Sequence, residues 1–274
     1  MIVIKKRRSA IPYKYIWFAR KPETLRAVDL VIYAQCGHAH PCLGFIRRKF
    51  STKIVDLQAS GEELLKNMSR KGAFDVKRAM RDGVQVRDIG DVEEFLTFYN
   101  SFAPQKGLAP VGRDDLAGWG RQIAGLTATI DGVPAAMHTY VVDRDRSRAR
   151  LLHSASLFRQ AASAEERTSI GRANRLLHYQ AMLRFKELGL AEYDLGGYAK
   201  DSPDPQLANI AKFKDTLGGR EVREDHFVSL PLYVLQQLGS LMSYVRSAGA
   251  GDLARLWPKR AAGDKKALTA QRRA

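Results

Sequence analysis

The sequence predicts an α+β fold, in which helices pack on a mixed α/β sheet. Short runs rich in β-branched and aromatic residues alternate with amphipathic segments of helical period, and three strand-like runs in the middle of the chain follow one another with only turns between them. With 274 residues and 45% hydrophobic content, the chain is long enough to bury a sizeable core. No window approaches the ~18 apolar residues that span a bilayer.

The first part of the chain predicts strands followed by a helical segment. We expect strands at 15–19, 29–34, 43–50 and 53–57, each bounded by turn residues. The segment 60–80 follows as a helix, because Ser60 precedes Glu62 and Glu63 in the pattern of an N-cap, and Gly83 ends it. A break at Gly72 would divide this helix into two.

A second cycle of strands and helices begins at residue 84. We expect a strand at 84–89, helices at 91–103 and 112–124, an antiparallel meander of three strands over 126–158, a helix at 169–190, a strand at 191–197, a helix at 205–219, and a last strand or pair over 220–231. The two cycles are candidates for diverged copies of one unit.

The positive charge lies at the two ends of the chain. The net charge is +16, of which +9 falls in residues 1–58 and +6 in residues 246–274, so the body between them is nearly neutral. Basic ends attract phosphates of RNA, of nucleotide-linked precursors or of an anionic membrane. For residues 259–274 a solubilising tail without a partner is an equal alternative.

The cysteines favour a reducing compartment and no metal. Cys36 and Cys42 are too few for a disulfide framework, and the start of the chain lacks a secretory apolar core. Both lie in CGHAHPC, which holds zinc-type ligands, but four ligands within seven residues that include Pro41 make an awkward chelate. We therefore expect a cytoplasmic protein without a metal, either free or peripheral to the inner face of the membrane.

Two stretches resemble a known family. IGRANRLLHYQAMLRFKELGLAEYDLGG followed by KFKDTLGG is similar to the Fem family of peptidoglycan-bridge aminoacyltransferases and their relatives in polysaccharide gene clusters, and RKGAFDVKRAMRDGVQVR resembles the helix that links the two halves of those proteins. The order of elements resembles the GNAT acyltransferase fold. The resemblance covers roughly residues 50–228. It implies two GNAT-like lobes: residues 1–83 as a partial lobe that binds the acceptor, residues 84–230 as the complete catalytic domain, and residues 231–274 as an amphipathic helix and basic tail.

The resemblance implies an amide-forming transferase with its reaction between two splayed strands. These strands would be 151–156 and 191–197, whose backbone N–H groups would bind the donor carbonyl, with Gly196 and Gly197 allowing close approach of the substrate. In the family, a Phe-Lys pair places a lysine where the acyl ester reacts. Here that pair is Phe213 and Lys214, and the ammonium would stabilise the developing negative charge. Without the resemblance, Lys214 would be read as a surface lysine on an amphipathic helix.

The donor site is expected at the start of the helix 169–190, where free N–H groups bind phosphate. Its residues would be Arg167, Ser169, Gly171, Arg172 and Asn174. The GNAT coenzyme A loop is matched with one extra residue, and an N-capped helix without a ligand is the alternative. We expect acyl-CoA as donor, and aminoacyl-tRNA as the alternative that Phe213-Lys214 and the basic ends favour.

Three further residues are catalytic candidates. Asp194, in an otherwise apolar strand, would either pair with a cation such as Lys212 or Arg175, which we favour, or accept the proton of the amine. His153, like His138, could act as a base, although core histidines of this kind are more often structural. Tyr198 could protonate a leaving group or close the strand.

The acceptor is expected to carry phosphate. Arg70, Lys77 and Arg78 could grip a nucleotide-sugar or lipid-linked precursor, or form a solvated basic face. The amphipathic segment 231–260 would pack on the body or lie on a membrane. The competing class, a non-catalytic RNA- or membrane-surface-binding protein, explains the charge but not the central motifs.

Overall fold

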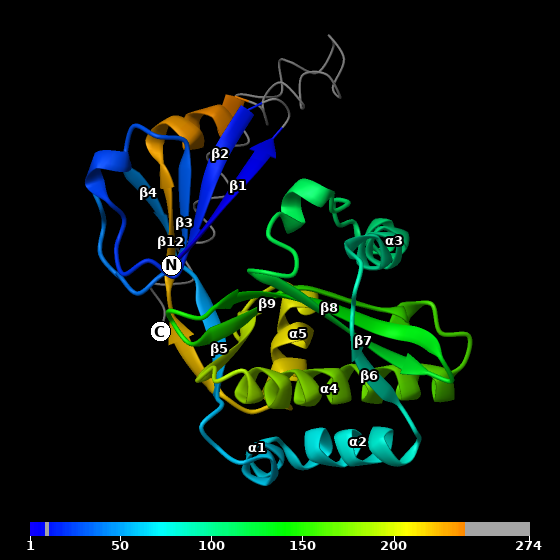
Figure 1. Ribbon diagram of the computed structural model, residues 1–274. Helices are drawn as coiled ribbons and strands as arrows, with labels where there is room; N and C mark the ends of the chain where they lie inside the picture. Colours follow the sequence, from blue (N-terminus) through cyan, green and yellow to red (C-terminus); the bar gives the residue numbers. More distant parts are fainter. Residues whose placement is uncertain (9–10, 239–274) are drawn as a thin grey trace.

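The computed structural model describes residues 1–238 apart from residues 9 and 10, and contains two mixed β-sheets (Figure 1). The five-stranded sheet has the order β1 (Ile2–Arg8), β2 (Ile11–Trp17), β3 (Val31–Cys36), β12 (Asp225–Ser229) and β4 (Phe45–Arg48). The seven-stranded sheet has the order β11 (Arg220–Arg223), β5 (Ser51–Asp56), β10 (Glu192–Gly197), β9 (Arg148–Ser156), β8 (Val133–Asp143), β7 (Ile123–Ile130) and β6 (Gln85–Asp88). The predicted fold class and the antiparallel meander, β7 to β9, are confirmed.

Helices cover both faces of the seven-stranded sheet. They are α1 (Gly61–Asn67), α2 (Arg70–Arg81), α3 (Val92–Phe102), α4 (Ala164–Glu187) and α5 (Pro205–Asp215). The long α4 and α5 lie on one face, and α2 packs on the outer side of α4 (Figure 1). The opposite face packs against α3 and against β1 and β2 of the five-stranded sheet. None of the helices in the described part of the chain is long and apolar enough to cross a membrane.

The two sheets have the same arrangement of strands, and each sheet contains one strand from the other half of the chain. In the five-stranded sheet β2 and β3 run parallel, β12 lies antiparallel beside β3, and β4 lies beyond it. In the seven-stranded sheet β9 and β10 run parallel, β5 lies antiparallel beside β10, and β11 lies beyond it. Yet β5 follows β4 in the chain, and β12 follows β11. Each half therefore gives its last strand to the sheet of the other half.

This exchange differs from the predicted boundary at residues 83 and 84. β5 precedes that boundary but belongs to the seven-stranded sheet, whereas β12 follows it and belongs to the five-stranded sheet. Local periodicity could not show this, because the pairing joins residues as distant in sequence as Ile54 and Asp194.

Three local predictions are corrected. The helix expected at 112–124 is only a 3-10 turn, Arg113–Leu116, because Gly118 and Gly120 adopt positive φ directly after it. The break in 60–80 falls at Met68, where Ser69 caps the next helix. Gly72 lies within α2, where an added Cβ would come within 2.1 Å of the Thr216 carbonyl oxygen.

Two parts of the chain were not predicted or are only partly described. The strand β1 was not expected, since its run of lysines and arginines hides an alternation of buried and exposed positions. Of the predicted amphipathic segment 231–260, only residues up to 238 are described, and residues 230–238 are helical. The rest of this segment and the basic tail lie outside the described residues.

Candidate active site

The backbone pairing of β9 and β10 stops partway along the two strands, and we call the place where they part the opening. The two strands pair in parallel from Glu192 with Arg148 to Asp194 with Arg150. Beyond these pairs β9 continues beside β8 and β10 stays beside β5. The carbonyl of Leu151 accepts a hydrogen bond from Arg150 Nη1 at 2.9 Å. The predicted splaying of 151–156 from 191–197 is therefore confirmed.

Gly196 forms the wall of the opening at the point where the strands part. Its φ is +74°, and an added Cβ would lie 3.3 Å from the Leu151 carbonyl oxygen, so glycine is required there. Its N–H donates to Asp194 Oδ1 at 2.7 Å. This N–H is therefore not free to bind a substrate carbonyl, which corrects the expectation of bare peptide nitrogens at this residue.

Lys214 reaches the opening from α5. Its side chain is buried, with 8% exposure, and Nζ donates to the Gly197 carbonyl oxygen at 2.6 Å. Burial, helped by the charge of Arg150 and opposed by that of Asp194, lowers the pKa of Lys214 to about 8. The structure thus places an ammonium group, with a pKa near the physiological range, where β10 leaves β9.

Phe213, the residue before this lysine, packs against two other side chains. The Arg175 guanidinium lies 4.8 Å from the centroid of the ring, and the ring of buried His178 packs 5.7 Å from it. His178 Nδ1 shares a hydrogen bond of 2.7 Å with the Tyr193 hydroxyl. Phe213 is therefore held by its contacts with Arg175 and His178.

Asp194 is a fully buried carboxylate with four donors. Arg148 Nη2 at 2.7 Å, Gln35 Nε2 at 2.8 Å, the Gly196 N–H and the Thr52 hydroxyl bind its oxygens. Burial would raise the pKa of Asp194, but Arg148 and Arg150, with the hydrogen bonds, outweigh it and hold the pKa below its ordinary value. The expected partners Lys212 and Arg175 are wrong: Arg175 pairs with Asp75. Such a carboxylate is poorly suited to accept a proton and joins the two sheets instead.

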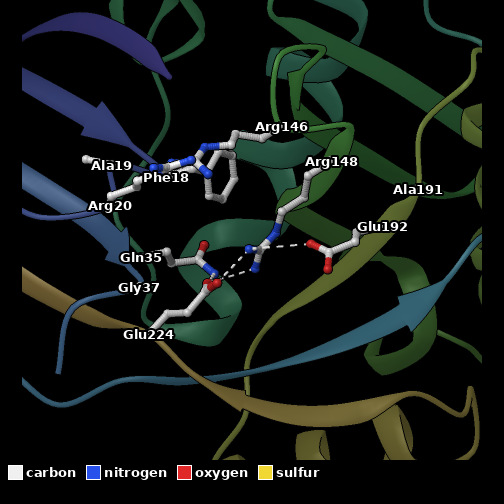
Figure 2. A pocket seen from close by; sticks show the side chains of 10 residues that line it. All are labelled: Phe18, Ala19, Arg20, Gln35, Gly37, Arg146, Arg148, Ala191, Glu192 and Glu224. Atoms are coloured by element: carbon white, nitrogen blue, oxygen red, sulfur yellow. Dashed lines mark hydrogen bonds and ion pairs between the residues drawn. The ribbon is translucent and has the colours of Figure 1, made fainter.

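A pocket of about 400 Å³ lies between the two sheets (Figure 2). Its lining residues are Phe18, Ala19, Arg20, Gln35, Gly37, Arg146, Arg148, Ala191, Glu192 and Glu224. Figure 2 shows the Arg148 guanidinium between Gln35 and Glu192, and Arg148 Nη1 bonds Glu224 at 2.7 Å. Gln35 Oε1 is buried and has no hydrogen-bond partner within the described residues.

The pocket lies at the position in the five-stranded sheet that corresponds to the β9–β10 opening of the seven-stranded sheet. The parallel pairing of β2 and β3 ends at Trp17 with Ala34, and the next residues of both strands line the pocket. Gln35 adopts φ +51° at the fifth position of β3, as Gly196 adopts φ +74° at the fifth position of β10. The sequence analysis did not predict this pocket. The two cycles of strands and helices could have indicated it, because two copies of one unit would place a similar opening in each sheet.

The predicted donor cradle is wrong in position. Helix α4 begins at Ala164, so Arg167, Ser169, Gly171, Arg172 and Asn174 lie in its body and not at its start. The Ser163 side chain accepts from the Glu166 N–H, and Glu166 Oε2 accepts from the Ala162 N–H at 2.6 Å. The true start is therefore capped by the chain itself and carries acidic side chains, which disfavours phosphate.

The side chains of the predicted cradle have other contacts. Asn174 Oδ1 lies 2.8 Å from His138 Nε2, Arg172 pairs with Asp75 and Asp82, and the Gly171 carbonyl accepts from Arg175. Arg167 is exposed and Ser169 is half-buried. Together these residues hold α4 against α2 and the sheet.

His153 and Tyr198 are each engaged elsewhere. His153 Nδ1 lies 2.8 Å from the Thr139 hydroxyl, and burial lowers the pKa of His153 to about 4, which makes it a weak base at neutral pH. The Tyr198 hydroxyl donates to Asp215 at 2.8 Å, and burial and that hydrogen bond raise the pKa of Tyr198 to about 12. The phenol therefore stays protonated but directs its proton at Asp215.

The predicted acceptor-binding residues do not reach the opening. Arg70, Lys77 and Arg78 are exposed on α2, and Arg78 pairs with Asp82. The start of α2 touches the end of α5, where the Ser69 N–H donates to the Thr216 carbonyl at 3.2 Å. For a metal, no group of three or more His, Cys, Asp or Glu side chains is suitably placed within residues 1–238 as described.

The parting parallel strands, the buried lysine beside them and the two strand-exchanging halves define a Fem-like fold of the GNAT type. The crystal structure of FemX is similar to this chain, with 14% identity, coverage of 86% of this chain and 85% of that chain, and a TM-score of 0.57. This likeness establishes the fold.

Two solved structures are more distantly similar. One is the C-terminal domain of a putative lysylphosphatidylglycerol synthetase from Agrobacterium fabrum, with 13% identity, 79% and 72% of the two chains covered, and a TM-score of 0.48. The other is L-PGS from Bacillus licheniformis, with 14% identity, 77% and 72% covered, and a TM-score of 0.48. No protein-family model and no curated protein matches the sequence.

Proposed function

We propose that the chain is an N-acyltransferase that moves an acyl group from an activated ester to an amine of a cell-envelope or polysaccharide precursor. The observation that carries the proposal is the buried ammonium of Lys214 at the parting of β9 and β10. In the reaction, the amine attacks the ester carbonyl, the C–O or C–S bond to the leaving group breaks, and the amine loses a proton. A preorganised cation stabilises the oxyanion of the tetrahedral intermediate, and removal of such a donor commonly costs about 10²–10³ in rate.

For the donor we favour aminoacyl-tRNA over acyl-CoA. Acyl-CoA, the donor expected from the sequence, was placed at the start of the long helix, and that start is capped by Ser163 and Glu166. The Phe213-Lys214 pair and the positive charge of residues 1–58 favour aminoacyl-tRNA, because Lys and Arg side chains attract RNA phosphates. The esterified amino acid would then lie with its carbonyl beside Lys214.

We propose that the phosphate groups of the acceptor bind in the pocket between the two sheets. Arg20 and Arg146 line this pocket, and neither side chain has an ion-pair partner in the described part of the chain. Two guanidinium groups beside a space of about 400 Å³ suit the pyrophosphate of a nucleotide-sugar or of a lipid-linked precursor.

The test measures binding and transfer separately on the full chain. Thermal unfolding is followed with aminoacyl-tRNA, with deacylated tRNA and with acyl-CoA; a ligand at 100 times its dissociation constant stabilises the folded state by about 2.7 kcal/mol. Stabilisation by acyl-CoA alone would support the alternative donor, and no stabilisation by any of the three would refute the transferase proposal.

Transfer is then assayed with labelled aminoacyl-tRNA and an amine acceptor. Lys214→Met is expected to lower kcat by about 10²–10³, and the control Lys212→Met, on the exposed side of the same helix, to leave it unchanged. Full activity of Lys214→Met would refute the catalytic role of Lys214, and absence of transfer by the wild type would favour the non-catalytic RNA- or membrane-surface-binding class.

A further inference from the structure

One end of the five-stranded sheet points away from the seven-stranded sheet (Figure 1). Exposed aliphatic residues lie in the turns at that end. Leu25, Val28 and Leu43 are 94%, 80% and 85% exposed, and Leu230 is 44% exposed. We refer to these four residues as the aliphatic tip. Single exposed aliphatic residues are common on proteins, but three that are at least 80% exposed at one end of a small sheet form a patch that calls for a partner.

The three segments of the aliphatic tip are joined by direct contacts. The Leu230 N–H donates to the Gly44 carbonyl at 3.0 Å, and the Ser229 hydroxyl donates to the Asp29 carbonyl at 2.6 Å. An added Cβ on Gly44 would lie 2.4 Å from the Ala27 Cβ, so these two turns touch. The exposed side chains are therefore held together by a hydrogen-bonded frame, as a preformed surface requires.

The charge of this half of the molecule selects among the possible partners. Residues 1–50 contain eleven Lys and Arg against Glu23 and Asp29, a net charge of +9. Both acids are already paired, Glu23 with Arg26 and Asp29 with Lys14. A second copy would meet the same positive charge and be repelled, while RNA bases would find aliphatic side chains and no exposed ring to stack on.

We propose that the aliphatic tip docks this protein on an anionic phospholipid surface. Leucine and valine side chains would enter the boundary between headgroups and acyl chains, and the net positive charge of residues 1–50 would draw this half of the molecule to the negative surface potential. Helix 230–238 begins at the tip and exposes Val234 and Leu238 at 52% and 50%, which extends the apolar face along one side. The proposal does not depend on the donor or acceptor proposed above.

The test is flotation of the full chain with vesicles of phosphatidylcholine alone or with 30% phosphatidylglycerol. Three proteins are compared: the wild type, the tip variant Leu25→Ser/Val28→Ser/Leu43→Ser, and the control variant Val133→Ser/Leu188→Ser/Leu207→Ser, whose residues are 62%, 44% and 45% exposed elsewhere on the molecule. All three are expected to have the same melting temperature within error, because the substitutions are on the surface.

We expect the wild type and the control to bind the anionic vesicles, and the tip variant to bind at least ten times more weakly. Binding should also weaken as the salt concentration rises. Equal binding of all three proteins would assign the attraction to other basic residues and overturn the proposal, as would equal binding to the neutral vesicles or no binding to either. A concentration-dependent dimer that the tip variant loses would overturn it as well, in favour of a second copy.

Discussion

Replacing Lys214 by methionine is expected to stabilise the folded protein while it removes activity. Burial lowers the pKa of Lys214 from its ordinary 10.5 to about 8. A pKa shift of one unit corresponds to about 1.4 kcal/mol, so at neutral pH the buried ammonium costs the folded state about 3–4 kcal/mol. Methionine fills a similar volume without charge, and the lost hydrogen bond to Gly197 offsets about 1.5 kcal/mol. The net gain in the free energy of unfolding is about 2 kcal/mol.

The pH dependence of this gain follows from the direction of the pKa shift. Below pH 8 Lys214 is protonated in both states, and the full cost is present. Between pH 8 and 10.5 the unfolded chain binds more protons at this residue than the folded chain, so the wild type gains stability as the pH rises. The advantage of Lys214→Met should therefore be largest at pH 7 and mostly disappear by pH 10.

The assay is guanidinium unfolding of the wild type, Lys214→Met and the exposed control Lys212→Met at pH 7 and pH 10. The control should stay within about 0.5 kcal/mol of the wild type at both values. The reasoning is refuted if Lys214→Met is less stable than the wild type at pH 7, or if its difference from the wild type does not change with pH.

Three other predictions test the site and its supports. Asp194→Asn removes the charge of a fully buried carboxylate, although Arg148 keeps its ion pair with Glu224, and should lower the free energy of unfolding by about 1–3 kcal/mol in urea titrations at pH 7. The difference should shrink as the pH falls and wild-type Asp194 takes up a proton, since its pKa is lowered in the folded state; an unchanged midpoint at pH 7 would contradict the account of its network. Gly196→Ala, at φ +74°, should cost about 1–2 kcal/mol, whereas Gly90→Ala, with open space around it and ordinary φ, should be nearly neutral; equal melting temperatures of the two variants would argue against a constrained wall at the opening. Ser163→Ala should lose about 1 kcal/mol and Ser169→Ala little, as measured by thermal unfolding, and the reverse order would restore the helix start first expected at residue 169.

The sequence predicted the helices and strands of the site better than the contacts between their side chains. The roles of Lys214 and of the two splayed strands were predicted from the resemblance to the Fem family, whereas the local pattern alone would have made Lys214 a surface lysine. The partners of Asp194 were not predicted: Arg148 and Gln35 come from other elements, 46 and 159 residues away, and nothing local marks them. The start of α4 could have been predicted, because Ser163 and Glu166 have the spacing of a capping box. The Ser-Ile-Gly-Arg run further on gave a competing signal for a helix start.

The fold was recognisable from the order of elements, while the allocation of strands to sheets was not. β5 and β12 have ordinary strand patterns, and each could have paired with its neighbour in the chain. Which sheet a strand joins is decided by side-chain packing between remote segments, and a single sequence reports this weakly.

The crossed placement of β5 and β12 has a consequence for how the polypeptide acquires its structure during synthesis. Cys36 finds its partner Asp225 only when nearly all of the described chain has left the ribosome, so β3 keeps an unpaired edge through most of translation. A fragment that ends before residue 225 lacks an interior strand of the first sheet, and one that starts after residue 56 lacks an interior strand of the second. The two halves should therefore be inseparable by proteolysis or truncation, and should gain and lose their structure in one slow, concerted step.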